Sequence, residues 1–200
     1  MILCGGKSRR AGFDKSFAKI GGKYIIETIH EKLSECFDNV RLCADSKERL
    51  SLFGLEIMED RLKGKTGPAV AIHSALAGAS SKYVFVTACD MPLIDAAHIE
   101  FMKHKLNSSS FSPDALVPVN GGYIEPLYSF YSAGIAGLFE EEIEKGNFKI
   151  SSILEMCDVQ YLEERYSKMF DERLAMFTNI NYQEDLEKIA GLGNVKRSKD

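Results

Sequence analysis

The chain has 200 residues, 45% of them hydrophobic, and a formal net charge of −4. This length and apolar content suffice for one large domain with a sizeable core, whereas two independent domains would each be small. No run of about 18 apolar residues occurs, and the first residues lack a charged segment followed by an apolar one. We therefore expect a cytoplasmic protein that binds neither membranes nor nucleic acid.

The cysteines and histidines show no metal-binding pattern. The chain has five cysteines, at Cys4, Cys36, Cys43, Cys89 and Cys157, and four histidines, at His30, His73, His98 and His104. An odd number of cysteines without any C-x-x-C pair argues against a disulfide framework or a zinc site, so we predict reduced, mostly buried thiols. The histidines fall on predicted helices without metal spacing, and we interpret them as surface or partly buried helix residues.

The start of the chain is strongly basic although the whole chain is acidic. Between Met1 and Lys23, six cations face a single anion, Asp14. An apolar run from Met1 predicts a buried strand that breaks into the glycine pair Gly5-Gly6 and then into the basic segment. Glycines let a backbone approach a polyphosphate, loop amides donate to it, and Arg or Lys side chains neutralise it. The pattern predicts a phosphate-binding loop, and the alternative is an ordinary Gly-Gly turn with a solvated basic loop.

Two familiar glycine motifs are absent from this segment. A P-loop needs a glycine five positions before Gly6-Lys7-Ser8, where Met1 stands instead. A dinucleotide-binding fingerprint needs its second glycine at the position of Lys7. A redox dehydrogenase is therefore disfavoured.

Short apolar strands alternate with amphipathic helices along the chain, which is typical of a parallel sheet with helices on both faces. The sequence Asn120-Gly121 favours the tight turn of an antiparallel hairpin. We therefore predict an α/β protein with a Rossmann-like three-layer α/β/α fold, a mostly parallel central sheet and an antiparallel hairpin element. The predicted strands are 1–4, 40–44, 55–58, 83–88, 115–119, 123–131, 159–162 and 175–181, and the main helices lie at 24–37, 47–52, 68–79, 95–106, 135–146 and from 148 onward.

Asp90 is the strongest single candidate for a functional residue. It follows the most β-like run of the chain, 83–88, and Pro92 stops the strand from continuing. An aspartate at the carboxyl end of a central strand lies at the crevice where α/β sheets bind ligands. Mg²⁺ suits one or two carboxylates together with phosphate oxygens and water. We predict that Asp90 binds Mg²⁺, and a turn or helix-cap role is the alternative.

The spacing Gly-Gly-x-Ser-x-Arg followed by Gly-x-Asp-Lys resembles the signature of the nucleoside-triphosphate nucleotidyltransferases. Its wording is most similar to that of the molybdenum cofactor guanylyltransferases, whose strand-Asp-x-Pro and Asn-x-Asn motifs match Asp90 and 179–181 in the same order. Ala11 replaces a usual methionine and Ala71 a usual glycine. The segment 163–173 matches poorly, and we assign it no role.

The resemblance implies transfer of GMP from GTP to molybdopterin, with release of pyrophosphate, to form molybdopterin guanine dinucleotide in molybdenum cofactor biosynthesis. It implies that Arg9, Lys15 and Asp90 are catalytic and that Asp90 is the Mg²⁺ ligand. The implied GTP-binding residues are Leu3, Cys4, Gly5, Gly6, Ser8, Lys15, Asp60, Gly67, Pro68 and Asp90, and the implied acceptor-binding residues are Lys149, Asn179 and Asn181.

The same resemblance implies one nucleotidyltransferase domain over 1–190, with an NTP-binding half at 1–95, an acceptor-binding half at 96–190 and a flexible tail at 191–200. It also allows for partner proteins from molybdenum cofactor biosynthesis or among the target enzymes. Three alternatives stay open. In the first, the chain is a related nucleotidyltransferase that uses CTP or a different phosphate acceptor. In the second, it is a non-catalytic nucleotide-binding module. The third concerns Asn181 alone, which together with Glu184 three residues on would only cap a helix.

Overall fold

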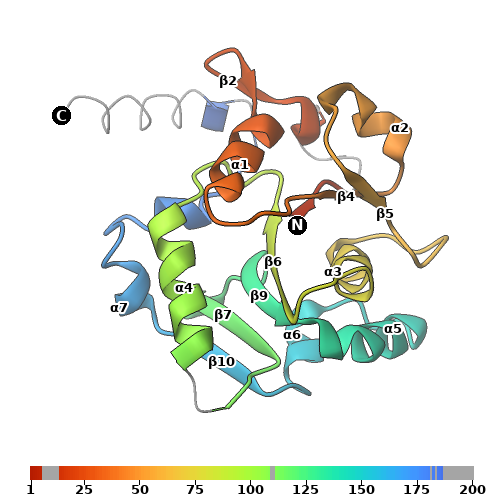
Figure 1. Cartoon of the computed structure of the whole chain (residues 1–200), viewed down its shortest axis with the longest axis vertical. Coiled ribbons are helices and arrows are strands. Elements are labelled where there is room, and N and C mark those ends of the chain that lie inside the picture. Colours follow the sequence, from red (N-terminus) through yellow and green to blue (C-terminus); the bar gives the residue numbers. More distant parts are fainter. Residues whose placement is uncertain (6–13, 109–110, 181, 183, 187–200) are drawn as a thin grey trace.

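The computed structural model describes residues 1–5, 14–108, 111–180, 182 and 184–186. Within these residues, eight strands form one sheet in the order β10-β7-β9-β6-β1-β4-β5, with β8 paired to β7 (Figure 1). The strands are β1 (Ile2–Leu3), β4 (Leu42–Ala44), β5 (Ile57–Glu59), β6 (Tyr83–Ala88), β7 (Ala115–Asn120), β8 (Tyr123–Ile124), β9 (Tyr128–Ser132) and β10 (Val159–Leu162), while β2 (Lys19–Ile20) and β3 (Lys23–Tyr24) form a separate hairpin.

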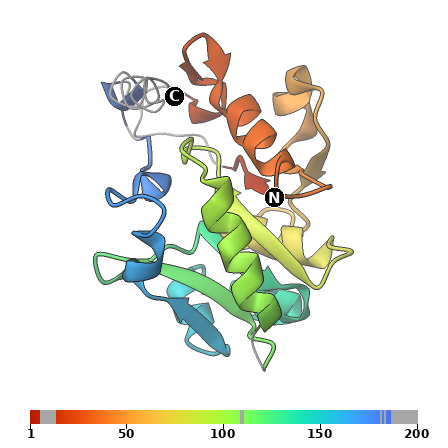
Figure 2. The ribbon, with the colours of Figure 1, turned by 60° about the vertical axis from the view of Figure 1, so that its left-hand side comes forward.

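Helices cover both faces of the sheet. They are α1 (Ile25–Ser34), α2 (Lys47–Leu50), α3 (Pro68–Ala77), α4 (Ala96–Ser108), α5 (Ala136–Glu144), α6 (Ile150–Leu154) and α7 (Glu164–Ser167), with 3-10 helices at Lys15–Phe17, Ser51–Phe53, Ala133–Ile135 and Ala175–Phe177. Helix α4 crosses one face of the sheet, as the turned view shows (Figure 2). The three-layer fold class predicted from the sequence is confirmed.

The sheet is mostly parallel, with one antiparallel strand in its middle. β1 runs parallel to β4 and β6, β4 to β5, and β7 to β10. β9 runs antiparallel to both β6 and β7. Because of this reversal, β9 begins where β6 ends, and Tyr128 lies opposite Thr87.

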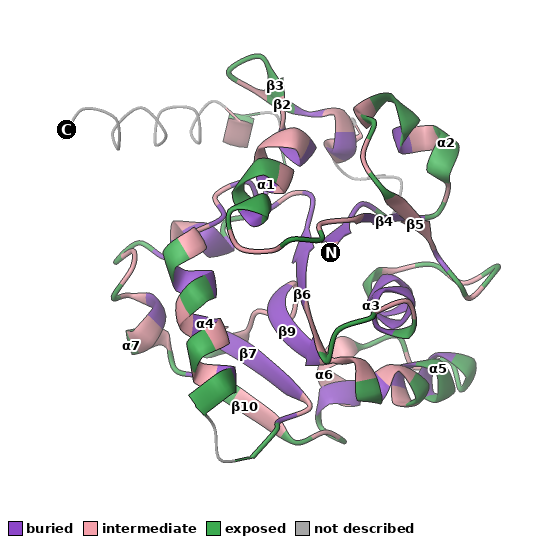
Figure 3. Ribbon diagram, viewed as in Figure 1, coloured by how far each residue is buried: buried purple, intermediate pink, exposed green. Residues whose placement is uncertain are grey.

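Alternation of side chains along the strands divides the core in two. In β1, Ile2 belongs to a cluster with α1 and α4, whereas Leu3 belongs to a cluster with α3, α5 and α6. In β6, Phe85 and Val86 divide in the same way. The strands β1, β4, β6, β7 and β9 are therefore mostly buried from both faces, while the outer faces of the helices are exposed (Figure 3).

The prediction of a strand at 175–181 is wrong. Residues Ala175–Phe177 form a 3-10 helix, entered through Leu174 at the positive φ of 52°. Met176 and Phe177 are buried in the cluster on the α1 and α4 face. These apolar residues thus cover the sheet from outside instead of extending it, and Asn181 lies outside the described residues.

The hairpin prediction is confirmed, but its turn differs from the one expected. Gly121 and Gly122 are the two turn residues, with φ of 57° and 82°. Asn120 instead ends β7 and pairs with Tyr123. Two consecutive positive φ values are the requirement of the type I′ turn, and glycine meets it without strain.

The strand predicted through 125–131 begins only at Tyr128. The carbonyl of Glu125 accepts from the N–H of Tyr128 at 3.1 Å and from the hydroxyl of Ser129 at 2.7 Å, which turns the chain before the strand starts.

Ser46 stands at the N-cap of α2 as expected, but its hydroxyl donates to the Glu48 side chain and makes no capping bond.

The cysteine prediction is confirmed. All five cysteines lie within the described residues and are free, and Cys4, Cys43 and Cys89 are buried. Among the described helices, none has the length and apolar character that a membrane span requires.

Two histidines are more deeply buried than the sequence suggested. His73 on α3 is 3% exposed and His98 on α4 is fully buried. The segment after β10 covers His98, because Ser167 lies 3.0 Å from its Nε2 and the Phe170 ring packs against it at 5.3 Å. Sequence periodicity missed this burial since the covering residues are about 70 positions away.

Burial lowers the pKa of His98 from 6.5 to about 4. The unfolded chain therefore binds more protons than the folded protein between these values, so the free energy of unfolding falls as pH falls through this window. We expect His98 to contribute a loss of up to about 3 kcal/mol between pH 7 and pH 4. Urea unfolding across this range should show a shallower pH dependence for His98→Gln, whereas exposed His104→Gln should keep the wild-type dependence. Equal pH dependence in all three proteins would contradict the assignment.

Candidate active site

The carboxyl ends of the parallel strands meet at one edge of the sheet, the usual ligand-binding edge of α/β folds. Asp45 follows β4 and Asp60 follows β5, while Gly5 and Asp90 lie two residues after β1 and β6. Since β1 pairs with both β4 and β6, these positions are brought to a common edge. The sequence-predicted nucleotide site thus has its strand-end residues in one region.

The centre of this edge is an ion pair between Lys15 and Asp90. The Nζ atom of Lys15 donates to Oδ2 of Asp90 at 2.8 Å, and the two side chains are 16% and 21% exposed. The residues are 75 positions apart in the chain. The structure therefore joins the lysine predicted to bind phosphate with the carboxylate predicted to bind metal.

Two segments hold the backbone around Asp90 in place. The N–H of Cys89 donates to the Leu3 carbonyl at 3.0 Å, which ties the end of β6 to β1. The N–H of the fully buried Ile180 donates to the Asp90 carbonyl at 2.8 Å. Asn179, which is exposed, lies directly before this anchor. The predicted acceptor residue Asn179 is thus brought close to Asp90 along the backbone.

Lys15 begins a 3-10 helix whose cap is Asp14. The Asp14 carboxylate accepts from the N–H of Ser16 at 3.0 Å and from Nη1 of Arg49 at 2.8 Å. Arg49 was missed by sequence analysis because it lies in a short polar helix, among charged neighbours, with no motif around it. Only the folded structure shows that it reaches the segment that bears Lys15.

The structure describes only some of the other residues of the predicted phosphate loop. Gly6, Ser8 and Arg9 lie outside the described residues. Leu3 and Cys4 are 6% and 1% exposed, with their side chains in the two opposite cores.

Asp60 is mostly inside the protein, at 8% exposure. Its N–H donates to the Ala44 carbonyl at 3.0 Å, and the Cys43 thiol donates to its Oδ1 at 3.5 Å. Burial raises the pKa of Asp60 and also the pKa of the Cys43 thiol. The carboxylate thus lies between β4 and α3, at the inner wall of the edge.

Gly67 and Pro68 open α3 as predicted. Gly67 is the N-cap residue with φ of 123°, and Pro68 is the first residue of the helix, where a missing N–H costs nothing. The preceding loop is fastened to the neighbouring helix, since Nζ of Lys65 donates to the Ile143 carbonyl of α5 at 2.9 Å. This arrangement leaves the first amides of α3 directed to the carboxyl edge.

Lys149 is exposed at the N-cap of α6. Its N–H donates to the Asn147 side chain at 3.2 Å. Within the described residues, no hydrogen bond or ion pair joins Lys149 to Asp90, so the structure does not bring this predicted acceptor residue into the central pair.

Glu125 is a further carboxylate at this edge, and sequence analysis did not select it. It lies three residues before Tyr128, which is opposite the end of β6. Burial raises the pKa of Glu125, and Nδ2 of Asn120 donates to its Oε1 at 3.0 Å. A half-buried carboxylate therefore stands just before the start of β9.

Asp90 is the carboxylate at this edge for which sequence analysis predicts a metal-binding role. Among the described residues, no group of three His, Cys, Asp or Glu side chains could hold a metal ion. A lone hard carboxylate fits Mg²⁺ better than zinc, because Mg²⁺ takes most of its ligands from substrate phosphates and water.

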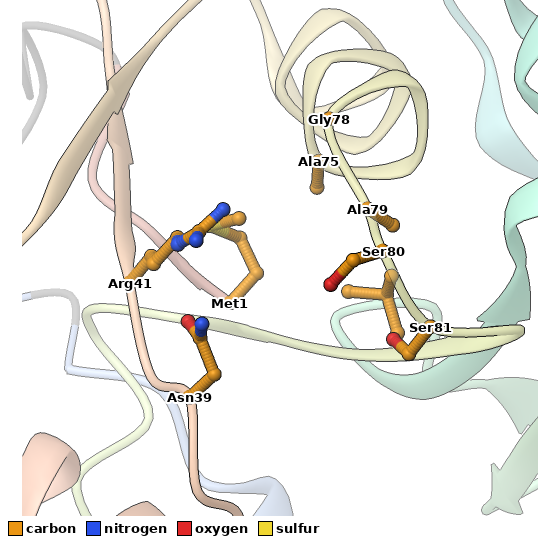
Figure 4. Close-up of a pocket in the computed structure, with 9 residues that line it drawn as sticks. Met1, Asn39, Arg41, Ala75, Gly78, Ala79, Ser80 and Ser81 are labelled. Carbon is orange, nitrogen blue, oxygen red and sulfur yellow. The ribbon is translucent and has the colours of Figure 1, made fainter.

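A cavity of about 80 Å³ lies at the opposite, amino edge of the sheet (Figure 4). Met1 and Arg41 line it from the strands, and Ala75 and Gly78 line it from the end of α3. Ligand pockets typically enclose roughly 300–1,000 Å³. This cavity is therefore too small for a nucleotide.

Comparisons with known proteins place this chain among a set of similar sequences and structures. The family model described as a MobA-like NTP transferase domain matches residues 1–163. A protein of Peptoclostridium acidaminophilum named probable molybdenum cofactor guanylyltransferase is 35% identical, over 94% of this chain and 86% of its own length. One of Syntrophotalea carbinolica, named molybdenum cofactor guanylyltransferase, is 34% identical over 94% and 88%. The solved structure of molybdopterin-guanine dinucleotide biosynthesis protein A from Archaeoglobus fulgidus matches with a TM-score of 0.83 and 30% identity, covering 96% of this chain and 97% of that one.

The positive φ of Gly67 predicts that an alanine at this position lowers the free energy of unfolding. Nothing lies within 4 Å of a Cβ added at Gly67, so Gly67→Ala should cost only the backbone strain, about 1–3 kcal/mol in the free energy of unfolding. Gly137 in α5 is equally uncrowded and has no positive φ, so Gly137→Ala should stabilise the protein by about 0.5–1 kcal/mol. Chemical denaturation of both variants checks this, and opposite signs are the expected result. A Gly67→Ala protein as stable as wild type would show that the loop does not need this conformation.

Proposed function

The chain belongs to the MobA-like NTP transferase domain family, and we propose that it transfers GMP from GTP to molybdopterin, with release of pyrophosphate. The product would be molybdopterin guanine dinucleotide. The observation that carries the proposal is the ion pair of Lys15 with Asp90 at the carboxyl edge, because nucleotidyl transfer needs a cation for phosphates next to a carboxylate for Mg²⁺. The names of the relatives support the choice of GTP and molybdopterin.

In this reaction the terminal phosphate of molybdopterin attacks the α-phosphorus of GTP in line. A new bond forms between the acceptor oxygen and the α-phosphorus, and the bond from that phosphorus to the bridging oxygen of the β-phosphate breaks. A phosphate monoester has its second pKa near 6, so the nucleophile is already an anion at neutral pH. The protein therefore has to orient two negative partners and neutralise charge, and it needs no general base.

The central pair supplies the charges for this task. Asp90 would hold Mg²⁺, which when bound neutralises the triphosphate and orients its oxygens. Lys15 exchanges the carboxylate for phosphate oxygens when the triphosphate arrives, so that its ammonium group always has an anionic partner. Arg9 would neutralise the leaving pyrophosphate together with Lys15, and the backbone around Gly5, Gly6 and Ser8 would donate to the phosphates.

The residues around the central pair would form two groups, one bordering the nucleoside and the other bordering the acceptor. Asp60, Gly67 and Pro68 border the nucleoside, in an NTP-binding half at 1–95. Lys149 and the Asn-x-Asn segment at 179–181 border the acceptor, in a half at 96–190. The contact of Ile180 with the Asp90 backbone supports this division, because it brings the end of the acceptor half to the metal carboxylate.

Asp90→Asn tests the metal role. The change keeps the size of the side chain and removes its charge, so we expect the single-turnover rate of dinucleotide formation to fall by about 10²-fold or more. A higher Mg²⁺ concentration should recover part of the loss. Asp38→Asn, in an exposed loop, is the matched control and should react as wild type does. Near-wild-type turnover of Asp90→Asn at limiting Mg²⁺ would exclude Asp90 as the ligand.

A further inference from the structure

Arg49 joins three chain segments at the carboxyl edge, and none of the roles above uses it. Its Nη1 donates to the Asp14 carboxylate at 2.8 Å and to the Ser16 hydroxyl at 3.2 Å. Its Nη2 donates to the carbonyl oxygen of Cys4, and its Nε donates to the Asp45 carboxylate at 3.2 Å. One guanidinium group therefore connects the residue after β1, the residue after β4, and the 3-10 helix that begins with Lys15.

These contacts involve every nitrogen of the guanidinium. Four of its five N–H donors have an acceptor within the protein, and the side chain is only 18% exposed. A bidentate contact with a phosphate would require part of this network to break. Arg49 is thus built to fix the protein's own segments and not to contact the nucleotide.

The segment that Arg49 fixes is the one that directs Lys15. Asp14 directly precedes Lys15 and caps its helix, which has a single turn. On the far side of that turn, stacking of Phe17 on Phe53 at 5.8 Å fixes the helix to the 3-10 helix Ser51–Phe53 that follows α2. With Arg49 of α2 holding Asp14, both ends of the turn are attached to the continuous segment 47–53, and the Lys15 side chain is directed to Asp90.

We propose that Arg49 is a positioning residue, which holds Lys15 in the direction of Asp90 and of the triphosphate. The proposal rests on the proposed function only in taking Lys15 as a phosphate ligand. A displacement of about 1 Å in a positioning contact can cost about 10²-fold in rate. The planar fork of arginine is required here, because a lysine ammonium at the same place could not reach acceptors in three directions.

The test is a double-mutant cycle between Arg49 and Lys15, measured as kcat/KM for GTP. Arg49→Gln should lower kcat/KM by about 10–10²-fold, and Arg49→Lys should restore only part of it. In a Lys15→Ala background, Arg49→Gln should have almost no further effect on kcat/KM, because Arg49 then has no Lys15 side chain to position. We expect a change of no more than about twofold, which is the usual error of such cycles. A purely structural loss would instead multiply with the Lys15→Ala effect.

Arg41→Gln is the matched control. Arg41 also forms a partly buried ion pair from its Nε, with Glu56 at 2.8 Å, but at the opposite end of β4. It should lose stability without loss of kcat/KM. If Arg49→Gln does not fold, as judged by thermal unfolding, Asp14→Asn removes the same contact more mildly and should show the same dependence on Lys15.

Two results would overturn the proposal. One is an unchanged kcat/KM in Arg49→Gln, and the other is an equal fold-loss in the presence and absence of Lys15. Calorimetric titration of each variant with GTP in the presence of Mg²⁺ measures GTP affinity without turnover. It therefore separates failure of the Arg49 proposal from failure of the proposed function. If wild type forms no dinucleotide, the same cycle in GTP affinity still decides whether Arg49 acts through Lys15.

Discussion

The ion pair between Lys15 and Asp90 depends on the rest of the fold for its geometry. Both side chains are mostly removed from water, so each needs a partner of opposite charge at close range. Asp90 is fixed by the pairing of β6 with β1 and by the N–H of Ile180, and Lys15 by the cap at Asp14. The early strands, a short helix and the segment around Ile180 thus all converge on one contact of 2.8 Å.

The sheet explains why this contact lies where it does. Parallel strands bring their carboxyl ends to one edge, and the antiparallel β9 brings its start to the same edge, next to the end of β6. The strand ends from the first and the second half of the chain therefore meet near Asp90. Burial raises the pKa of Glu125, which lies just before β9, and it raises the pKa of Asp60, which follows β5, for the same reason.

The features that could be predicted from the sequence are the ones with a local signal. The run before Asp90 is strongly β-like and Pro92 follows Asp90, so both the predicted strand and its place in the sheet were correct. The strand predicted at 175–181 was wrong, because its apolar residues pack on the outside of the sheet, and only the tertiary structure decides between the two. Arg49, Glu125 and the burial of His98 could not be predicted, since each depends on partners far along the chain. The roles of all the predicted site residues stay predictions, and Arg9 and Asn181 also lie outside the described residues.

The most direct test of the account follows the label of GTP through the reaction. The chain is incubated with Mg²⁺, molybdopterin and GTP that carries radioactive phosphorus at either the α- or the γ-position, with α-labelled CTP as the competitor. The account predicts that the α-label of GTP appears in the dinucleotide, that the γ-label leaves as pyrophosphate, and that the Asp90→Asn protein does neither at a comparable rate. Recovery of the γ-label as orthophosphate, or of the α-label only in unreacted GTP, would contradict nucleotidyl transfer at the Lys15 and Asp90 pair.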